Sequence, residues 1–171
     1  MLIKNGLCYP PHEVKYEQSI VAPAVNYLFQ LYELTGKILY LEEGKKQLAV
    51  LVLFNGHQPD FHMYENAVRH WDGYWFGKYK NLGDTFPHYW SSLSGVAFRE
   101  YEKITGERSY GVKAENSLRG VLSMINSDGS ASCAYVYPFM VNNVRCQYAD
   151  PWANDQDWAL YYYLKEGKNY D

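Results

Sequence analysis

The stretch "ELTGKILYLEEGKKQLAVLVLF" (33–54) decides the fold, because its pattern returns 70 residues later as "KITGERSYGVKAENSLRGVLSM" (103–124). An internal repeat of this length indicates a structural unit used more than once. In both copies a Thr-Gly pair separates two stretches with helical spacing of apolar residues. The matched pairs are Thr35 with Thr105, Gly36 with Gly106, Tyr40 with Tyr110 and Leu48 with Leu118.

Each copy predicts two helices joined at the Thr-Gly pair. Glycine adopts the left-handed conformation that commonly ends a helix, so Gly36 and Gly106 are predicted C-cap residues. Upstream of the glycines, Leu28, Leu31 and Leu34 match Phe98, Tyr101 and Ile104, which predicts one apolar face per first helix. Tyr40 and Tyr110 are expected to pack at the start of each second helix.

The connections between the helical units carry hairpin signals. The stretch "SCAYVYPFMVNNVRCQYAD" (132–150) places cysteine, aromatic or valine residues at every second position on both sides of Asn142-Asn143, which predicts two strands joined by a tight turn. These positions are Cys133, Tyr135, Tyr137, Phe139 and Val141 before the turn, and Val144, Cys146 and Tyr148 after it. One repeat earlier, "VRHWDGYWFGK" (68–78) surrounds Asp72-Gly73 with aromatic residues. We expect a second hairpin there, although residues 63–78 also fit helical spacing.

Partial copies of the unit stand at both ends. "LIKNGLCYPP" (2–11) precedes a helical stretch that Pro23 either kinks or starts, and "DQDWALYYYLKEG" (155–167) predicts a third first helix. The fold class is therefore predicted as all-α dominated: an array of helical hairpins with short β-hairpins in the long loops, forming one partial domain over 1–171. Stacked hairpins with open ends suggest a fragment of a larger array, or a homo-oligomer that covers those ends.

Composition excludes several classes of protein. The net charge is -3 and the Lys and Arg residues are scattered, so no nucleic-acid partner is expected. The longest apolar run (48–54) is far shorter than the roughly 20 residues of a membrane span, so no membrane partner is expected either. The three cysteines have neither disulfide-framework nor metal-site spacing, and no secretory signal is visible, which favours the cytoplasm.

Topology predicts where function lies. If every unit runs up one helix and down the next, the long connections all return to one end of the array. These connections are rich in carboxylates and aromatic rings. Rings suit the apolar faces of sugars and carboxylates suit their hydroxyls, so an oligosaccharide or glycan is the expected ligand.

Two carboxylates are the catalytic candidates. Asp72 is the predicted general acid, its pKa raised by the neighbouring Trp71 and Trp75, although an Asp-Gly pair also serves turns for backbone reasons alone. Asp84 is the predicted second carboxylate, or alternatively the N-cap of a helix beginning near Pro87. Glycosidic bond cleavage typically uses such a pair.

The remaining candidates would bind the substrate. They are Trp71, Trp75, His70, His88, Trp90, Glu13, Asp150, Trp152 and Asp155. Some of these acids can equally cap helices or occupy first helical turns. The histidines lack the spacing of a metal site and no Gly-rich phosphate loop is present, so no metal and no cofactor are expected.

Three stretches, "NGLCYPPHEVKYEQSIVAPA" (5–24), "PDFHMYENAVRHWDGYWFGKYKNLGDTFPHYWSSLSG" (59–95) and "DPWANDQDWALYYYL" (150–164), resemble six-hairpin glycosidase-like proteins. That group includes bacterial glycoside hydrolases and unsaturated glucuronyl hydrolases. The resemblance implies an α/α toroid with a sugar cleft at its loop-rich end and hydrolysis of glycosidic bonds. It covers about half a toroid and looks like a C-terminal half, so the alternative is a non-catalytic carbohydrate-binding or structural fragment of a larger glycosidase.

Overall fold

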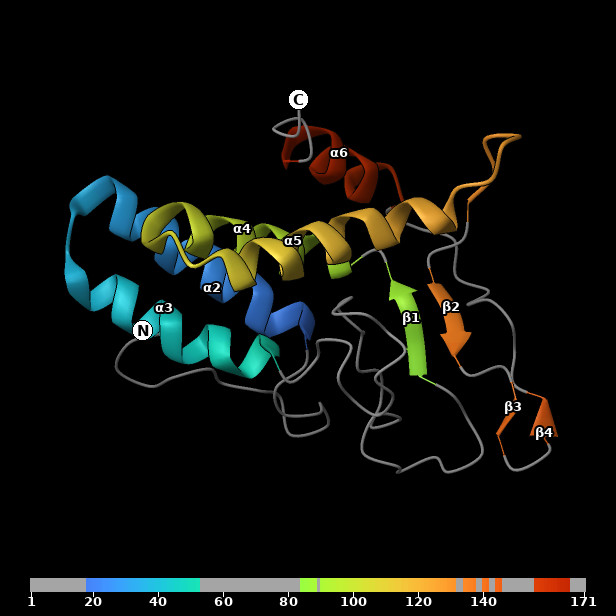
Figure 1. Ribbon diagram of the computed structural model, residues 1–171, viewed down its shortest axis with the longest axis horizontal. Coiled ribbons are helices and arrows are strands. Elements are labelled where there is room, and N and C mark those ends of the chain that lie inside the picture. Colours follow the sequence, from blue (N-terminus) through green and yellow to red (C-terminus); the bar gives the residue numbers. More distant parts are fainter. Residues whose placement is uncertain are drawn as a thin grey trace.

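The computed structural model describes residues 18–52, 84–88, 90–131, 134–137, 140–141, 144–145 and 156–166. Two helical hairpins dominate this part of the chain (Figure 1). The first consists of α2 (Gln18–Thr35) and α3 (Ile38–Val52), and the second of α4 (Ser91–Thr105) and α5 (Arg108–Gly120). The short 3-10 helix η2 (Val121–Met124) continues α5, and α6 (Gln156–Glu166) packs against α4 and η2.

Both hairpins turn at the predicted Thr-Gly pair. Gly106 has a φ of 75° and its N–H donates to the carbonyl of Glu102 at 2.7 Å. Thr105 Oγ1 donates to the carbonyl of Tyr101 at 2.7 Å and accepts the N–H of Glu107 at 3.2 Å, so the threonine satisfies backbone groups that the helix end leaves free. The first hairpin repeats this arrangement at Thr35, Gly36 (φ 66°) and Lys37. The predicted left-handed C-caps are confirmed.

The two hairpins share an aromatic core. Phe29 of α2 and Tyr101 of α4 have ring centroids 5.8 Å apart, and Tyr101 meets Tyr110 of α5 edge-on at 4.6 Å. Tyr110 therefore packs at the start of its helix as expected. Helix α3 approaches α2 closely at Gly44, because the Phe29 ring occupies the space that a Cβ there would need. The apolar face predicted for α2 is shorter than expected, since Leu34 is 82% exposed.

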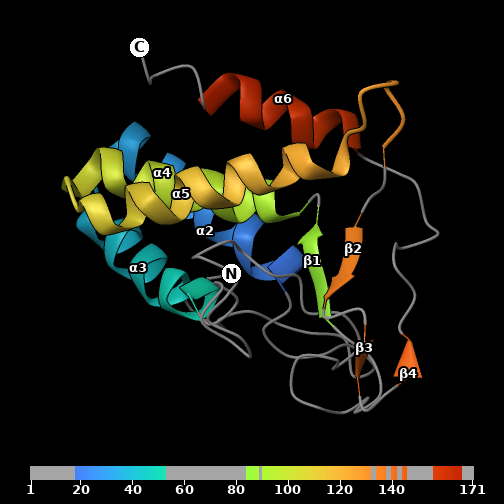
Figure 2. The same cartoon turned by 45° about the vertical axis from the view of Figure 1, so that its right-hand side comes forward.

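The first helices of the units lie side by side. Helix α4 contacts α2 on one flank and α6 on the other, and all three run in the same direction away from the strands (Figures 1 and 2). Helices α3 and α5 run back, each against its own partner. The predicted third first helix, 155–167, is confirmed as α6. The arrangement is an array of helical hairpins, a partial helical toroid.

Pro23 lies inside α2, in its second turn, rather than at its start. It removes one intrahelical hydrogen bond, which would have run from residue 23 to the carbonyl of residue 19. The N-terminal partial hairpin (2–11) lies outside the described residues.

Two small antiparallel sheets stand at the end of the array opposite the Thr-Gly turns (Figure 1). Strand β1 (Asp84–His88) pairs with β2 (Ala134–Tyr137), and β3 (Met140–Val141) pairs with β4 (Val144–Arg145). The predicted hairpin across 142–143 is confirmed as β3 and β4. The upstream part of the same stretch, Ala134–Tyr137, pairs with β1 as β2 and not with β4.

Candidate functional site

The pairing of β1 with β2 joins two long connections at one end of the molecule. Strand β1 belongs to the connection that precedes α4, and β2 belongs to the connection that follows α5. In register, Asp84 lies opposite Tyr137 and Thr85 opposite Val136. We call the end of the molecule that carries β1 and β2 the loop-bearing end. The two connections therefore meet, as the topology predicted.

Strand β1 is irregular for a reason visible in its sequence. Thr85 pairs with Val136 and His88 pairs with Ala134, so β1 advances by three residues where β2 advances by two. The extra residue on β1 marks a β-bulge. Pro87 falls in this bulge. Proline has no N–H to give to a ladder, so within sheets it is confined to edges and bulges, and a two-stranded sheet offers both.

Asp84 and His88 both lie on β1, at the loop-bearing end. The structure thus places this candidate carboxylate and this histidine on one short strand. The alternative role of Asp84, as N-cap of a helix beginning near Pro87, is wrong, because α4 begins at Ser91 and residues 84–88 are paired with β2. Long-range pairing with β2 overrides the local Asp-x-x-Pro signal.

Trp90 is the cap residue of α4 and is half-buried. Its side chain packs against a small cluster made of Val121 and Met124 of η2 and Ala159 of α6. A ring held in this way connects the start of α4 to two other elements. The Trp90 ring therefore takes part in packing within the protein.

The other predicted site residues lie outside the described residues. They are Asp72, His70, Trp71, Trp75, Glu13, Asp150, Trp152 and Asp155, and the expected hairpin around Asp72-Gly73 belongs to the same stretch.

The first turns of α4, next to the loop-bearing end, are buried where they contact α2 and α5. Ser91, Ser92 and Ser94 are fully buried, and a Cβ at Gly95 would collide with Leu118 of α5. From α2, Asn26 Nδ2 donates to the carbonyl of Leu93 at 3.2 Å. Small residues let the helices approach closely here, which fixes the position of α4 relative to its neighbours.

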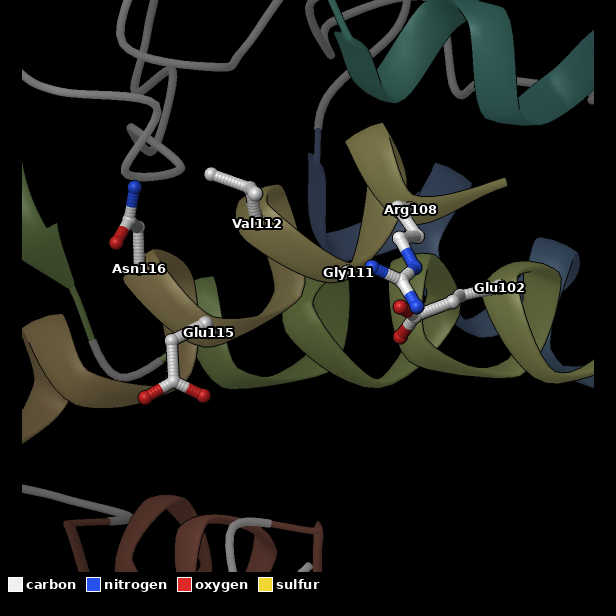
Figure 3. Close-up of a pocket in the computed structure, with 6 residues that line it drawn as sticks. All are labelled: Glu102, Arg108, Gly111, Val112, Glu115 and Asn116. Carbon is white, nitrogen blue, oxygen red and sulfur yellow. The ribbon is translucent and has the colours of Figure 1, made fainter. Parts of the chain in front are cut away.

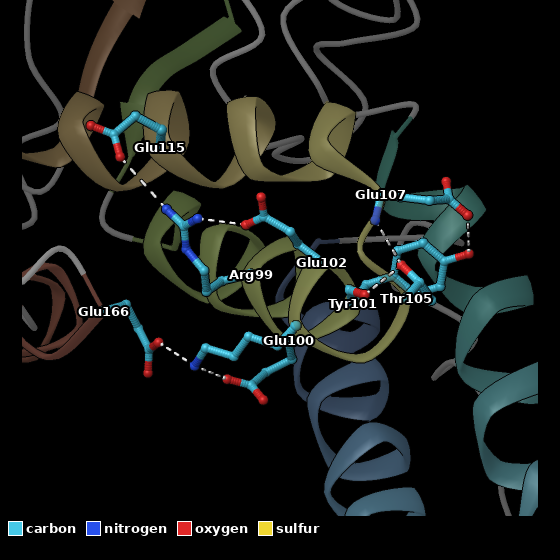
Figure 4. A network of polar contacts seen from close by, with 9 residues as sticks. Arg99, Glu100, Tyr101, Glu102, Thr105, Glu107, Glu115 and Glu166 are labelled. Atoms are coloured by element: carbon cyan, nitrogen blue, oxygen red, sulfur yellow. Dashed lines mark hydrogen bonds and ion pairs between the residues drawn. The ribbon is translucent and has the colours of Figure 1, made fainter. Parts of the chain in front are cut away.

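A buried arginine connects α4 to α5 (Figure 4). Arg99 is 8% exposed; its Nη1 donates to Glu102 Oε2 at 2.6 Å and its Nη2 lies 3.6 Å from Glu115 Oε2. Glu115 also pairs with Arg119. An arginine is rarely buried unless it is paired, and two carboxylates supply the compensating charge here.

A second network connects α4 to α6 (Figure 4). Lys103 Nζ donates to Glu100 Oε1 at 2.8 Å and to Glu166 Oε2 at 3.0 Å, and Glu166 is only 5% exposed. Burial works to lower the pKa of Lys103, but its bonds to Glu100 and Glu166 raise the pKa above its ordinary value. The lysine is therefore held charged between two helices.

Neither network was predicted from the sequence. The pairs of Arg99 with Glu102 and of Glu100 with Lys103 are three residues apart, a helical signal that could have been noticed. The bonds to Glu115 and Glu166 cross between helices, and sequence spacing alone does not reveal them.

A pocket of about 310 Å³ opens on the outer side of α4 and α5 (Figure 3). It is lined by Glu102, Arg108, Gly111, Val112, Glu115 and Asn116. A Cβ at Gly111 would collide with the Glu102 carboxylate, so the glycine makes room for the Arg99 network. The carboxylates of this pocket are engaged by arginines, which indicates a structural role.

Within the described ranges, no group of His, Cys, Asp and Glu side chains is arranged to hold a metal ion. In the same part of the chain, no helix combines the length and the apolar character that a bilayer crossing requires.

Comparison with known proteins gives one informative result. No family model matches the chain, and no curated protein matches it. Among solved structures, a polysaccharide lyase is 54% identical in sequence, with a TM-score of 0.77. The alignment covers 98% of this chain and 25% of that protein, so the chain spans about a quarter of its length.

Proposed function

We propose that this chain is a carbohydrate-active protein whose loop-bearing end takes part in cleaving a polysaccharide by elimination. The observation that carries the proposal is the 54% identity to a polysaccharide lyase, sustained over 98% of the chain. Identity at that level, in an alignment that spans nearly the whole chain, supports a shared ligand class as well as a shared fold.

Elimination differs from the hydrolysis that the resemblance to six-hairpin glycosidases implied. A general base removes the proton from the carbon next to the carboxyl group of a uronate. The bond from the adjacent carbon to the leaving sugar oxygen then breaks, a carbon–carbon double bond forms, and the oxygen takes up a proton. No water is consumed.

Both reactions need one group that accepts a proton and one that donates it. Asp72 remains the leading candidate, with Asp84 as its partner, and Asp84 stands on β1 at the loop-bearing end. The glycan is proposed to contact aromatic rings and polar side chains of the long connections. The rings are those of Trp71, Trp75 and Trp152, and the polar side chains are those of His70, His88, Glu13, Asp150 and Asp155. For Trp90, the packing against η2 and α6 supports a structural role beside any contact with sugar.

The test incubates the 171-residue chain with a uronate-containing polysaccharide in water enriched in oxygen-18. Elimination gives products that absorb ultraviolet light through the new conjugated double bond and carry no oxygen-18 at the cleaved position. Hydrolysis gives oxygen-18 in the new reducing end without that absorbance. The proposal is overturned by the hydrolytic pattern.

The Asp72→Asn variant assigns the chemistry. We expect it to fold like the parent, as judged by circular dichroism, and to lose about a hundredfold or more of the activity. Full activity in this variant would remove Asp72 from the mechanism.

The chain also has a second candidate function, favoured by its coverage of only 25% of the polysaccharide lyase. It would bind glycan, or support a larger protein, without cleaving it. Saturable quenching of tryptophan fluorescence by oligosaccharides, with no product in either assay, is the outcome that selects binding.

A further inference from the structure

A groove of about 430 Å³ runs over α4 between its flanking helices α2 and α6. Helix α2 lines it with positions 26, 30 and 33, and α4 lines it with positions 96, 100 and 103. The second set is the first set moved by one repeat of 70 residues. The repeat therefore presents equivalent positions of successive helices to one continuous groove. These residues are Asn26, Gln30, Glu33, Val96, Glu100 and Lys103.

Helix α6 closes the other side with Tyr162, Lys165 and Glu166. All these positions fall in the middle or C-terminal half of their helices, and the three helices run away from the strands (Figures 1 and 2). The groove is therefore separate from the loop-bearing end, where the catalytic candidate Asp84 lies.

Opposite charges alternate closely along the groove. Lys103 lies between Glu100 at 2.8 Å and Glu166 at 3.0 Å, and Lys165 stands next to Glu166 in the chain. At such distances the fields of the two signs largely cancel for a ligand that spans them. Glu33 adds a third carboxylate against the two lysines, so the lining disfavours an anion, and Lys103 already pairs with two of the three carboxylates that a cation would need.

Hydrogen-bonding capacity remains in the groove. Asn26 Oδ1 is buried without a hydrogen-bond partner among the described residues, while its Nδ2 donates to Leu93. The atom is inaccessible to solvent in this conformation, so a ligand that brings a donor would satisfy it only after the Asn26 amide turns toward the groove. Carboxylates can only accept and ammonium groups can only donate, whereas a hydroxyl does both and so can pair with every polar group here.

We propose that this groove is a second saccharide-binding site, which takes neutral, hydroxyl-rich sugar units. The proposal rests on the proposed function, because it assumes that glycan is the protein's ligand. The volume of the groove lies within the range of about 300–1,000 Å³ that ligand pockets have. Tyr162 adds an aromatic ring to the lining, of the kind that packs on the apolar face of a sugar.

The test titrates the 171-residue chain with three neutral disaccharides, cellobiose, maltose and lactose, and follows side-chain amide signals by ¹H–¹⁵N NMR. We expect saturable shifts at the amide groups of Asn26 and Gln30 with at least one of the sugars. Gln30 is exposed at the edge of the groove, so Gln30→Trp should fill the groove without disturbing the core and weaken binding by about tenfold or more.

The matched control is Lys46→Trp, at another exposed position, on α3, which is not part of the groove lining. It should leave both the shifts and the affinity unchanged. Absence of shifts at Asn26 and Gln30 overturns the proposal, and so does binding that Gln30→Trp and Lys46→Trp affect equally.

The outcome is separable from that of the proposed function. Cleavage of uronate polysaccharide without groove shifts would remove this second site alone. Groove shifts that Gln30→Trp abolishes, in a chain that yields no product, would support the site and overturn cleavage.

Discussion

Among single residues, Glu33 carries a testable link between pH and stability. Burial, followed by the nearby Glu100 carboxylate, raises the pKa of Glu33, with Lys103 acting in the opposite direction. The folded protein therefore holds this proton more tightly than the unfolded chain does. The associated stability is fully present below the unfolded pKa of about 4.3 and is lost as the pH rises through the higher folded pKa.

We predict that Glu33→Gln raises the melting temperature at pH 7 and that this gain shrinks toward pH 4. The gain should be only about a few tenths of a kcal/mol, because Glu33 is largely exposed and solvent screens its charge. Thermal melts across that pH range measure it. Glu42→Gln, an exposed glutamate on α3, is the control, and identical profiles for the two variants would contradict the prediction.

Other single residues show what sequence reasoning can determine. Gly36 and Gly106 were predicted as left-handed caps because a local rule governs them, and both have positive φ. Asp84 satisfied an equally local rule for an N-cap, but the N-cap role proposed for it as the alternative is wrong. The difference is the distant strand β2, which pairs with residues 84–88 and which no local signal at Asp84 could reveal.

Between elements, the Arg99 network is the main polar connection from α4 to α5. Arg99→Ala would leave Glu102 and Glu115 without their buried cation. We predict a loss of about 2–3 kcal/mol in the free energy of unfolding, below the value for a fully buried pair because both carboxylates are partly exposed. Urea unfolding monitored by circular dichroism measures it.

Arg119→Ala is the matched control. Arg119 pairs with the same Glu115, but its side chain is 65% exposed. An exposed pair contributes at most about 1 kcal/mol, so this variant should unfold close to the parent. Equal losses in the two variants would show that burial of Arg99 does not set its contribution.

The elements also show the limits of sequence patterns. The helices of the hairpins and α6 could be predicted because their apolar spacing and turn residues recur every 70 residues. Within the stretch 132–150, residues 134–137, 140–141 and 144–145 are strands, as predicted, but the pairing partner predicted for 134–137 was wrong. Alternation indicates a strand and a buried face; it does not identify the neighbouring strand.

For the whole molecule, Trp90 connects the second hairpin to α6 through η2. We predict that Trp90→Ala costs about 2–3 kcal/mol, less than for a fully buried tryptophan, and that it lowers hydrogen-exchange protection throughout α6. Tyr161→Ala removes an exposed ring from α6 and should change protection little. Unchanged protection of α6 in Trp90→Ala would show that its packing is dispensable.

The candidate site could be predicted from the sequence only in outline. The repeat and the up-and-down topology predicted that the connections meet at one end, and the pairing of β1 with β2 confirms this for the described residues. Asp84 and His88 are placed there, while the roles of Asp72 and the surrounding rings stay predictions. A pattern of residue types indicates a ligand class, but distances between reacting groups depend on packing across the whole array.

The pairing of β1 with β2 also has a consequence for the order of folding. Each helical hairpin closes across two residues, at Gly36-Lys37 and Gly106-Glu107, so its contacts are local and can form early. Asp84 and Tyr137 are separated by both helices of the second hairpin, and their pairing closes a far longer loop at a greater entropic cost. We therefore expect the loop-bearing end to assemble last, on helices that are already docked.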